Sequence, residues 1–188
     1  ISDPGEELVA ACAAQGIPVV SIPGPCALVT ALAASGLPTG RFTFEGFLPM
    51  NKKNRRAHLD QLRGEGRTMV FYEAPHKLQA TLADLAEVFG PERPIALCRE
   101  LTKLHEEIFR TTLGEAAEHY AAEPPRGEFV LVLAGAAAPE EAPMTLEEGA
   151  ARVRALRAEG LSLRDAARQV AGETGLSRKE LYQRALEG

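Results

Sequence analysis

The segment Gly16–Ser35, with the sequence GIPVVSIPGPCALVTALAAS, constrains the fold of this chain more than any other stretch. A β-branched run over 19–22 predicts a buried strand, Pro23-Gly24-Pro25 predicts a tight turn, and small aliphatic residues then recur at helical spacing. A glycine turn that opens a helix leaves amide hydrogens available to a carboxylate, phosphate or nucleotide. The junction is therefore a candidate binding site, although an ordinary close-packed strand-to-helix connection has the same pattern.

The composition is that of a globular protein. Its 188 residues, with 45% apolar and 25% charged side chains, are enough for one substantial core and a small second domain. The sequence contains no run of about 18 apolar residues, which is the length that predicts a membrane span. Cys12, Cys26 and Cys98 lack paired spacing, so we expect reduced thiols, a cytoplasmic location, and neither a disulfide nor a metal site.

The first residues, Ile1-Ser2-Asp3-Pro4-Gly5, have the composition of a loop and include no initiator methionine. An apolar-periodic run follows at once and predicts a helix that Asp3 caps and Gly16 ends. Such a loop normally follows a strand. We therefore expect a fragment whose preceding part is absent.

The middle of the chain alternates predicted strands and helices, which indicates an α/β fold. A helix is predicted from Pro75 to about Phe89, and a shorter one over Gly114–Tyr120. The predicted strands are Arg41–Phe47, Thr68–Glu73, Pro94–Cys98, Glu107–Thr112 and Gly127–Leu133.

A basic segment stands out in this acidic chain, whose net charge is −5. Between Met50 and Arg67 there are six basic and two acidic residues. A phosphate-bearing partner would explain the cluster, and so would a solvated helix face. The candidate RNA-binding residues are Lys52, Lys53, Arg55, Arg56 and Arg63.

The C-terminal part has a different character. Gly135–Pro143 is a linker by composition, and three helical segments follow, over Arg152–Ala158, Leu163–Gly172 and Ser177–Leu186. The last two resemble a helix-turn-helix, and eight basic against five acidic residues from Ala151 onward are compatible with nucleic acid. A dimerisation or packing module would have the same pattern.

Several common chemistries lack their motifs. The sequence contains no GxxxxGK[ST], HExxH or GxSxG pattern and no paired cysteine and histidine set. The four histidines are dispersed, and a lone histidine without a placed partner is usually not catalytic. These observations argue against the standard nucleotide-hydrolase, zinc-hydrolase and serine-hydrolase mechanisms.

Five motifs in register resemble one known family. ISDPG, IPGPCALVTALAASGLPTGRFTFEGFLP, FYEAPHKL, CRELTKLHEE and GEFVLVLAG are together similar to the small-subunit ribosomal RNA methyltransferase I group of the tetrapyrrole methylase superfamily. The resemblance spans Ile1 to about Gly135, and the tail resembles the helical extension of some members. A single Pro-Gly turn would be a weak match, whereas five motifs are a strong one.

The resemblance implies a function and a cofactor. The function is S-adenosylmethionine-dependent 2′-O-methylation of a cytidine ribose in the decoding region of small-subunit rRNA, by a homodimer without a metal. The implied fold is an α/β, tetrapyrrole methylase-like mixed five-stranded sheet flanked by helices, with a small all-helical extension. The expected boundaries are 1–24 for the end of a first cofactor-binding domain, 25–137 for the second domain, 138–145 for a linker and 146–188 for the extension.

Cofactor contacts carried over from the family fall on five segments of this chain. In relatives a hydroxyl residue usually occupies the position of Cys26; if that hydroxyl binds the cofactor, its loss costs about 1 kcal/mol. The expected contact residues are Ile1, Pro23, Gly24, Cys26, Ala27, Phe71, Tyr72, Cys98, Arg99, Gly127 and Glu128.

Methyl transfer to a ribose hydroxyl also requires removal of a proton. The candidates for a base or a charge-positioning pair are Glu73, after a strand end, and Glu100 with Lys103. A structural ion pair that orders a loop is the other interpretation. Two alternative functions stay open, a small-molecule methylase acting on tetrapyrroles, and a nucleic-acid-binding module that uses the terminal helix-turn-helix.

Overall fold

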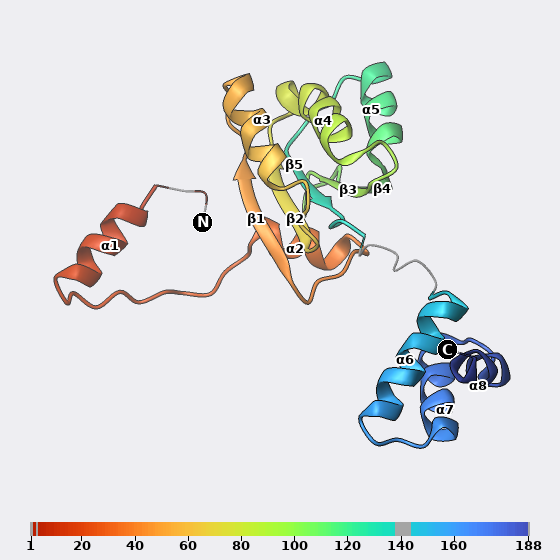
Figure 1. Cartoon of the computed structure of the whole chain (residues 1–188). Coiled ribbons are helices and arrows are strands. Elements are labelled where there is room, and N and C mark those ends of the chain that lie inside the picture. The colour runs from red at the N-terminus through yellow and green to blue at the C-terminus, as the bar shows by residue number, and fades with distance from the viewer. Residues whose placement is uncertain (1, 3, 138–143, 188) are drawn as a thin grey trace. The chain divides into compact units, whose positions relative to one another are not determined.

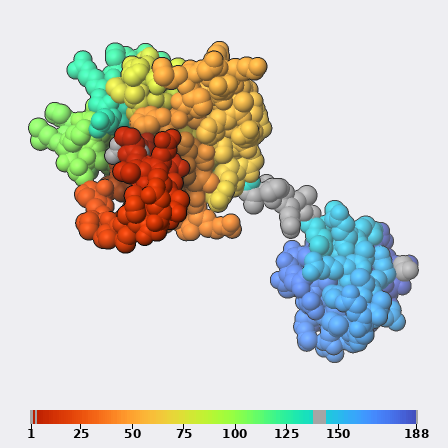
Figure 2. Space-filling view, turned by 90° about the vertical axis from the view of Figure 1, so that its left-hand side faces the viewer, coloured from red at the N-terminus to blue at the C-terminus, as the bar shows by residue number. Residues whose placement is uncertain are grey.

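The computed structural model describes residues 2, 4–137 and 144–187. The chain divides into two compact units, 1–137 and 138–188 (Figure 1, Figure 2). The first unit contains a β-sheet with flanking helices, and the second contains helices only in its described part. Each unit is described here by itself.

The sheet is mixed and has five strands: β1 (Phe42–Phe47), β2 (Thr68–Glu73), β3 (Pro94–Arg99), β4 (Glu107–Thr112) and β5 (Phe129–Leu133). Their order is β1-β2-β5-β3-β4. β1 and β2 are parallel, whereas β5 runs antiparallel to both β2 and β3. The carboxyl ends of β1, β2 and β3 therefore share one edge of the sheet with the start of β5. All five strands predicted within 41–133 are confirmed.

The two faces of the sheet differ in the size of their side chains. Alternation along each strand sends large residues such as Phe71, Leu97 and Leu131 to one face and smaller ones such as Ala96 and Val132 to the other. Helices α3 (Lys52–Gln61), α4 (Pro75–Phe89) and α5 (Leu113–Ala122) cover the first face. Among the described helices, only α2 (Ala27–Ala34) packs on the second, through Leu28, Ala31 and Leu32 (Figure 1).

The strand predicted over 19–22 is wrong. Helix α1 (Glu6–Ala14) is followed by an extended segment with no strand assignment, in which Val20 and Ile22 are each 81% exposed. A β-branched run becomes a strand only when its amide and carbonyl groups pair with a neighbour, and no described strand lies beside this one. The predicted helix cap Asp3 lies outside the described residues, and the N-cap of α1 is Gly5, which makes no side-chain cap bond.

The second unit packs three helices around one small core. These are α6 (Leu146–Ala158), α7 (Leu163–Thr174) and α8 (Arg178–Leu186), drawn in cyan to dark blue in Figure 1. A capping box between Thr145 and Glu148 starts α6 six residues before the predicted segment. Gly175, with a φ of 74°, ends α7 in the left-handed conformation, and Ser177 caps α8. The predicted helix-turn-helix arrangement is confirmed.

None of the described helices is long and apolar enough to cross a membrane. Within residues 2, 4–137 and 144–187, no group of three or more histidine, cysteine or acidic side chains is arranged to hold a metal ion.

Candidate functional site

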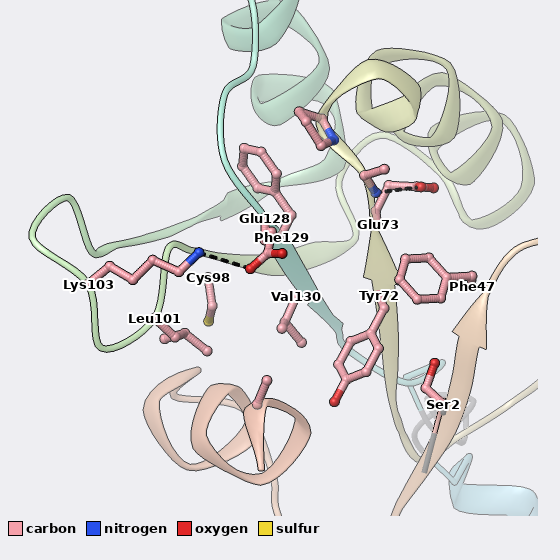
Figure 3. A pocket seen from close by; sticks show the side chains of 13 residues that line it. Ser2, Phe47, Tyr72, Glu73, Cys98, Leu101, Lys103, Glu128, Phe129 and Val130 are labelled. Carbon is pink, nitrogen blue, oxygen red and sulfur yellow. Dashed lines mark hydrogen bonds and ion pairs between the residues drawn. The ribbon is translucent and has the colours of Figure 1, made fainter. Parts of the chain in front are cut away.

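A cavity of about 520 Å³ opens at the sheet edge where the carboxyl ends of β1, β2 and β3 meet the start of β5. Three of the motifs singled out in the sequence converge on it, as predicted: Ala27 from the PGPCA turn, residues 72–75 from FYEAP, and Cys98, Leu101 and Lys103 from CRELTK (Figure 3). Ligand sites in open α/β sheets lie at this edge. Lining side chains also include Ser2, Phe47, Glu128, Phe129 and Val130.

One wall of the cavity is aromatic and centres on Tyr72. The rings of Phe44 and Phe47 stand edge-on to Tyr72, with centroids 4.9 and 5.7 Å away. The amide of Leu28, in the first turn of α2, donates a hydrogen bond of 3.1 Å to the Tyr72 hydroxyl. Burial raises the pKa of Tyr72, so the phenol is neutral at pH 7. The N-terminus of α2 is therefore partly occupied by a side chain of the protein itself.

The opposite rim is an ion cluster of Glu100, Lys103 and Glu128. The Lys103 ammonium lies 2.9 Å from a carboxylate oxygen of each glutamate (Figure 3 draws the pair with Glu128). The Glu128 amide donates to the Glu100 carboxylate at 2.9 Å, and the Glu100 amide donates to the Glu128 carbonyl at 3.0 Å. Lys103 lowers the pKa of Glu100, and the two carboxylates raise the pKa of Lys103. Both stay ionised at pH 7, and the cluster carries one net negative charge.

The loop that carries this cluster is conformationally strained. Glu100 and Thr102 have φ values of 51° and 64°, in the left-handed region that residues other than glycine seldom adopt. The Glu106 carboxylate accepts a hydrogen bond of 2.6 Å from the Thr102 amide and holds the turn. Gly127, at φ 85°, is required beside it, because a Cβ atom there would lie 2.5 Å from the Glu100 side chain. The segment 100–106, called here the strap, thus positions Lys103 over the cavity.

Glu73 lines the cavity, but its carboxylate is engaged by α4. It is 4% exposed and accepts hydrogen bonds from the Ala74 amide at 2.8 Å and the Thr81 hydroxyl at 2.6 Å. One oxygen is thus bound at the start of α4, where a negative charge is favourable, and the other is bound by a hydroxyl further along the same helix. This geometry supports the structural interpretation of Glu73 rather than the role of a general base.

Cys98 also lines the cavity and is fully buried. Burial raises the pKa of its thiol to about 11, so the thiolate is not available at neutral pH. We therefore regard Cys98 as a packing residue of the cavity floor.

Other predicted contacts do not line this cavity. Pro23 and Gly24 are exposed in the segment before α2, and Cys26 is its half-buried N-cap residue. Phe71 points into the core on the far face of the sheet, and Arg99 pairs there with Glu107 at 3.0 Å. Both miss the cavity because successive side chains of a strand face opposite ways. Ile1 lies outside the described residues. Gly127 does not line the cavity, but its lack of a side chain leaves room for Glu100 of the strap.

Sequence reasoning missed Phe47, Leu101 and Val130. Phe47 and Val130 lie in predicted strands, at the same sheet edge as the predicted motifs. Leu101 lies inside the RELTK cluster, between the charged residues predicted for the site. Proximity to the predicted strand ends was the available signal.

Most of the basic segment folds as α3, with Arg63 and Arg67 just beyond its end, and its arginines are paired. The Arg55 guanidinium lies 2.5 Å from the Asp84 carboxylate, and Arg56 lies 2.5 Å from Glu87, both on α4. Arg63 pairs with Asp60 at 2.9 Å and donates to the Val88 carbonyl at 3.1 Å. Lys52 and Lys53 make no ion pair with any acid in the described part of the chain. These ion pairs favour the structural interpretation for Arg55, Arg56 and Arg63, and their contact with RNA stays a prediction.

Comparison with known proteins gives two family matches. The model for Tetrapyrrole (Corrin/Porphyrin) Methylases matches residues 1–117, and the model for the RsmI C-terminal HTH domain matches residues 144–188. Among solved structures, the methyltransferase CobJ superposes with a TM-score of 0.52 at 24% identity, covering 73% of this chain and 59% of that one. Cobalt precorrin-4 methyltransferase gives 0.52 at 14% identity, covering 70% and 58%. These likenesses show the fold alone.

Curated relatives extend the match over the whole chain. Proteins named ribosomal RNA small subunit methyltransferase I are 50% identical in Synechocystis and 46% in Pseudomonas aeruginosa, each over all of this chain and 67% of the relative. The relative from Escherichia coli O157:H7 is 43% identical over all of this chain and 65% of its own length. The chain thus spans about two thirds of these relatives. It belongs to the tetrapyrrole methylase family and, within that family, to the ribosomal RNA small subunit methyltransferase I group.

Proposed function

We propose that this protein takes part in the S-adenosylmethionine-dependent methylation of a cytidine ribose 2′-hydroxyl in small-subunit rRNA. The observation that carries the proposal is the 50% identity, over the whole chain, to a relative named for methylation of this rRNA. The cavity supports it, because the motifs shared with the family converge there rather than scatter over the surface.

The cavity has the chemistry that the proposed cofactor needs. Its volume of about 520 Å³ lies within the range of small-molecule sites. The aromatic wall at Tyr72 and Phe47 offers apolar contact to a nucleoside, and the carboxylates of Glu100 and Glu128 give the rim a net negative charge. When bound, the cofactor supplies an electrophilic methyl group on a positively charged sulfur, which a negative rim favours.

The charged residues of the rim are suited to positioning rather than to proton removal. A general base works best when its pKa lies near the working pH. Lys103 is held protonated and Glu100 is held ionised, so both pKa values lie away from neutrality. In the proposal these two residues shape the strap, and the reaction gains from fixed placement of its partners. Ala27, Tyr72, Cys98 and Glu128 remain the proposed cofactor contacts among the predicted set.

The proposal includes contact between RNA and the two unpaired lysines of α3. Lys52 and Lys53 are exposed in the first turn of that helix. It also includes a cytoplasmic location and a homodimer, which the family resemblance supports. Light scattering on the purified protein tests the dimer, and a monomer at all concentrations would contradict it.

The decisive experiment maps ribose methylation by mass spectrometry on small-subunit rRNA, from cells with the intact or disrupted gene for this protein. We expect one cytidine to lose its 2′-O-methyl group on disruption and to regain it when the gene is restored. An unchanged methylation map would overturn the proposed function. Restoration with Lys103→Met should give partial methylation, whereas Lys77→Met, a matched change at a half-buried lysine of α4 that forms no ion pair with a described acid, should restore it fully.

A second measurement addresses the cofactor directly. Titration calorimetry with S-adenosylhomocysteine should show binding that Tyr72→Ala weakens at least tenfold and Tyr72→Phe weakens less, because the ring remains. Methylation of a precorrin by the same protein, without RNA, would instead support the tetrapyrrole alternative.

A further inference from the structure

The surface of α8 combines exposed cations with an exposed aromatic ring and an exposed amide. Arg178, Lys179, Tyr182 and Gln183 are all exposed and lie on one arc of the helix, called here the α8 face. The adjoining side of the helix, at Leu181 and Ala185, is buried in the core of the unit. No carboxylate belongs to the α8 face.

The two cations of the α8 face have no acid to neutralise them. Neither Arg178 nor Lys179 forms an ion pair with an acid of residues 2, 4–137 or 144–187. Arg184, on the other flank of the helix, is by contrast engaged by Glu147 and by Glu187. Paired and unpaired cations thus lie on different sides of α8. The paired Arg184 lies beside α6, and the unpaired Arg178 and Lys179 lie on the α8 face.

The position of these cations in the helix costs stability. The positive end of a helix dipole favours acids in the first turn. Helices α6 and α7 follow this rule, with Glu147 and Glu148 in one first turn and Asp165 in the other. Helix α8 has an acid there too, Glu180, but it begins with Arg178 and Lys179, whose charges oppose the dipole. A bound anion would offset the repulsion.

The fold presents this helix end outward. Leu176 and Leu181 pack so tightly on α6 that a Cβ at Gly149 would lie 2.9 and 2.6 Å from their side chains. The turn at 175–177 is therefore clamped against α6, and α8 is held rigidly as the second helix of a helix-turn-helix (Figure 1). In such motifs the start of the second helix is the part that contacts nucleic acid.

We propose that the α8 face binds RNA, with Arg178 and Lys179 on backbone phosphates and Tyr182 and Gln183 on an adjacent base. The identity of the RNA as small-subunit rRNA rests on the proposed function above. Unpaired cations supply the phosphate contacts, a phenol ring supplies a stacking surface, and an amide supplies both a donor and an acceptor.

The test measures binding of the whole chain to a labelled RNA fragment of the small-subunit decoding region by fluorescence anisotropy, across a series of salt concentrations. The variant R178E/K179E should weaken binding at least tenfold at low salt. It should also reduce the slope of log K against log salt by about 1.4 to 1.8, as expected for two lost phosphate contacts. Acids in the first turn suit the helix dipole, so the variant should fold.

Two controls distinguish a specific contribution of the α8 face to RNA binding from the effect of net charge and from the effect of misfolding. R164E/R168E makes the same charge change on exposed positions of α7 and should weaken binding less than threefold. Tyr182→Ala should weaken binding severalfold while leaving the salt slope unchanged, and circular dichroism should show native helix content in all variants.

Three results would overturn the proposal: no RNA binding by the unaltered chain, equal losses in the α7 control, or equal competition by duplex DNA of the same length. Binding is measured without a methyl donor, so it is independent of the methylation map. If the methylation map does not change when the gene is disrupted, but RNA binding still depends on the α8 face, the proposed function is rejected and the RNA-binding proposal is not.

Discussion

Helices α3 and α8 both begin with two exposed cations that pair with no described acid, but the arginines that follow in α3 are paired. In α3 the arginines reach acids on α4, including Asp84 and Glu87, and hold the two helices together. In α8 the first two cations face outward without a described acidic partner. The larger basic cluster in the sequence is thus mostly paired, apart from Lys52 and Lys53, and the smaller one carries the RNA contact proposed for α8. Charge count alone does not identify a nucleic-acid surface, because pairing removes the charge that a phosphate would meet.

The largest expected effect concerns the unit that supports α8. Leu181→Ala removes a fully buried side chain and should lower the free energy of unfolding of the helical unit by about 3 kcal/mol. Urea unfolding followed by hydrogen exchange should show loss of protection in α6–α8 and little change in the sheet. Equal loss in both units would contradict their independence. Leu186→Ala, at an exposed position of α8, is the matched control.

Arg55→Met tests whether α3 is held by its ion pair. The Arg55 and Asp84 side chains are only 14% and 19% exposed, so an uncompensated carboxylate should cost about 2 kcal/mol of unfolding free energy. The double variant Arg55→Met with Asp84→Leu should recover most of the loss. RNA affinity, measured where the variant is folded, should fall less than twofold. A large fall would mean that Arg55 contacts RNA directly.

Asp60→Asn should leave Arg56 and Arg63 less completely paired, so that more of the positive charge near α3 is available, as it is on the α8 face. Asp60 lies 3.3 Å from Arg56 and 2.9 Å from Arg63, and its neutralisation frees part of their charge. We expect RNA affinity at low salt to rise about twofold to threefold, with a steeper salt dependence. Anisotropy titrations against Asp165→Asn, which frees a cation on α7, give the comparison. If RNA affinity does not rise, we would conclude that RNA does not contact α3.

The smallest effect is a pH dependence next to α3. Arg67 lowers the pKa of Glu65 to about 2, from an ordinary value of 4.5, through hydrogen bonds to its carboxylate. Because the unfolded chain binds this proton more readily, the contribution is fully present above pH 4.5 and is lost as the pH falls towards 2. Urea midpoints of Glu65→Gln should therefore depend less on pH over this window than those of the unaltered chain. Equal slopes would show that the pair does not stabilise the fold.

The predictions from sequence were most accurate where local patterns and packing agree. Strands β2 and β5 have continuous apolar runs, and α4 begins at a proline and has its apolar residues at helical spacing. The Val19–Ile22 run has the same local pattern but no partner among the described strands, and it remains exposed. Hydrogen bonds to a neighbouring strand decide between these outcomes, and they are not visible in a local window.

The candidate site shows the same limit. The motifs located the correct edge of the sheet, because the carboxyl ends of strands and the turns after them carry recognisable residues. They could not show that Phe71 and Tyr72 face opposite sides, or that the Glu73 carboxylate is bound to Thr81. Orientation and hydrogen-bond partners come from packing.

The sequence by itself determined the family, the order of strands and helices from residue 27 onward, and the segments that build the cavity, since these depend on local patterns and on motifs in register. Only the tertiary structure decided which charges remain available. Arg56 and Glu87 are 31 positions apart in the chain, and Lys103 and Glu128 are 25 apart. Electrostatic interactions fall with distance in space rather than with separation in sequence, so folding neutralises one set of cations and exposes another.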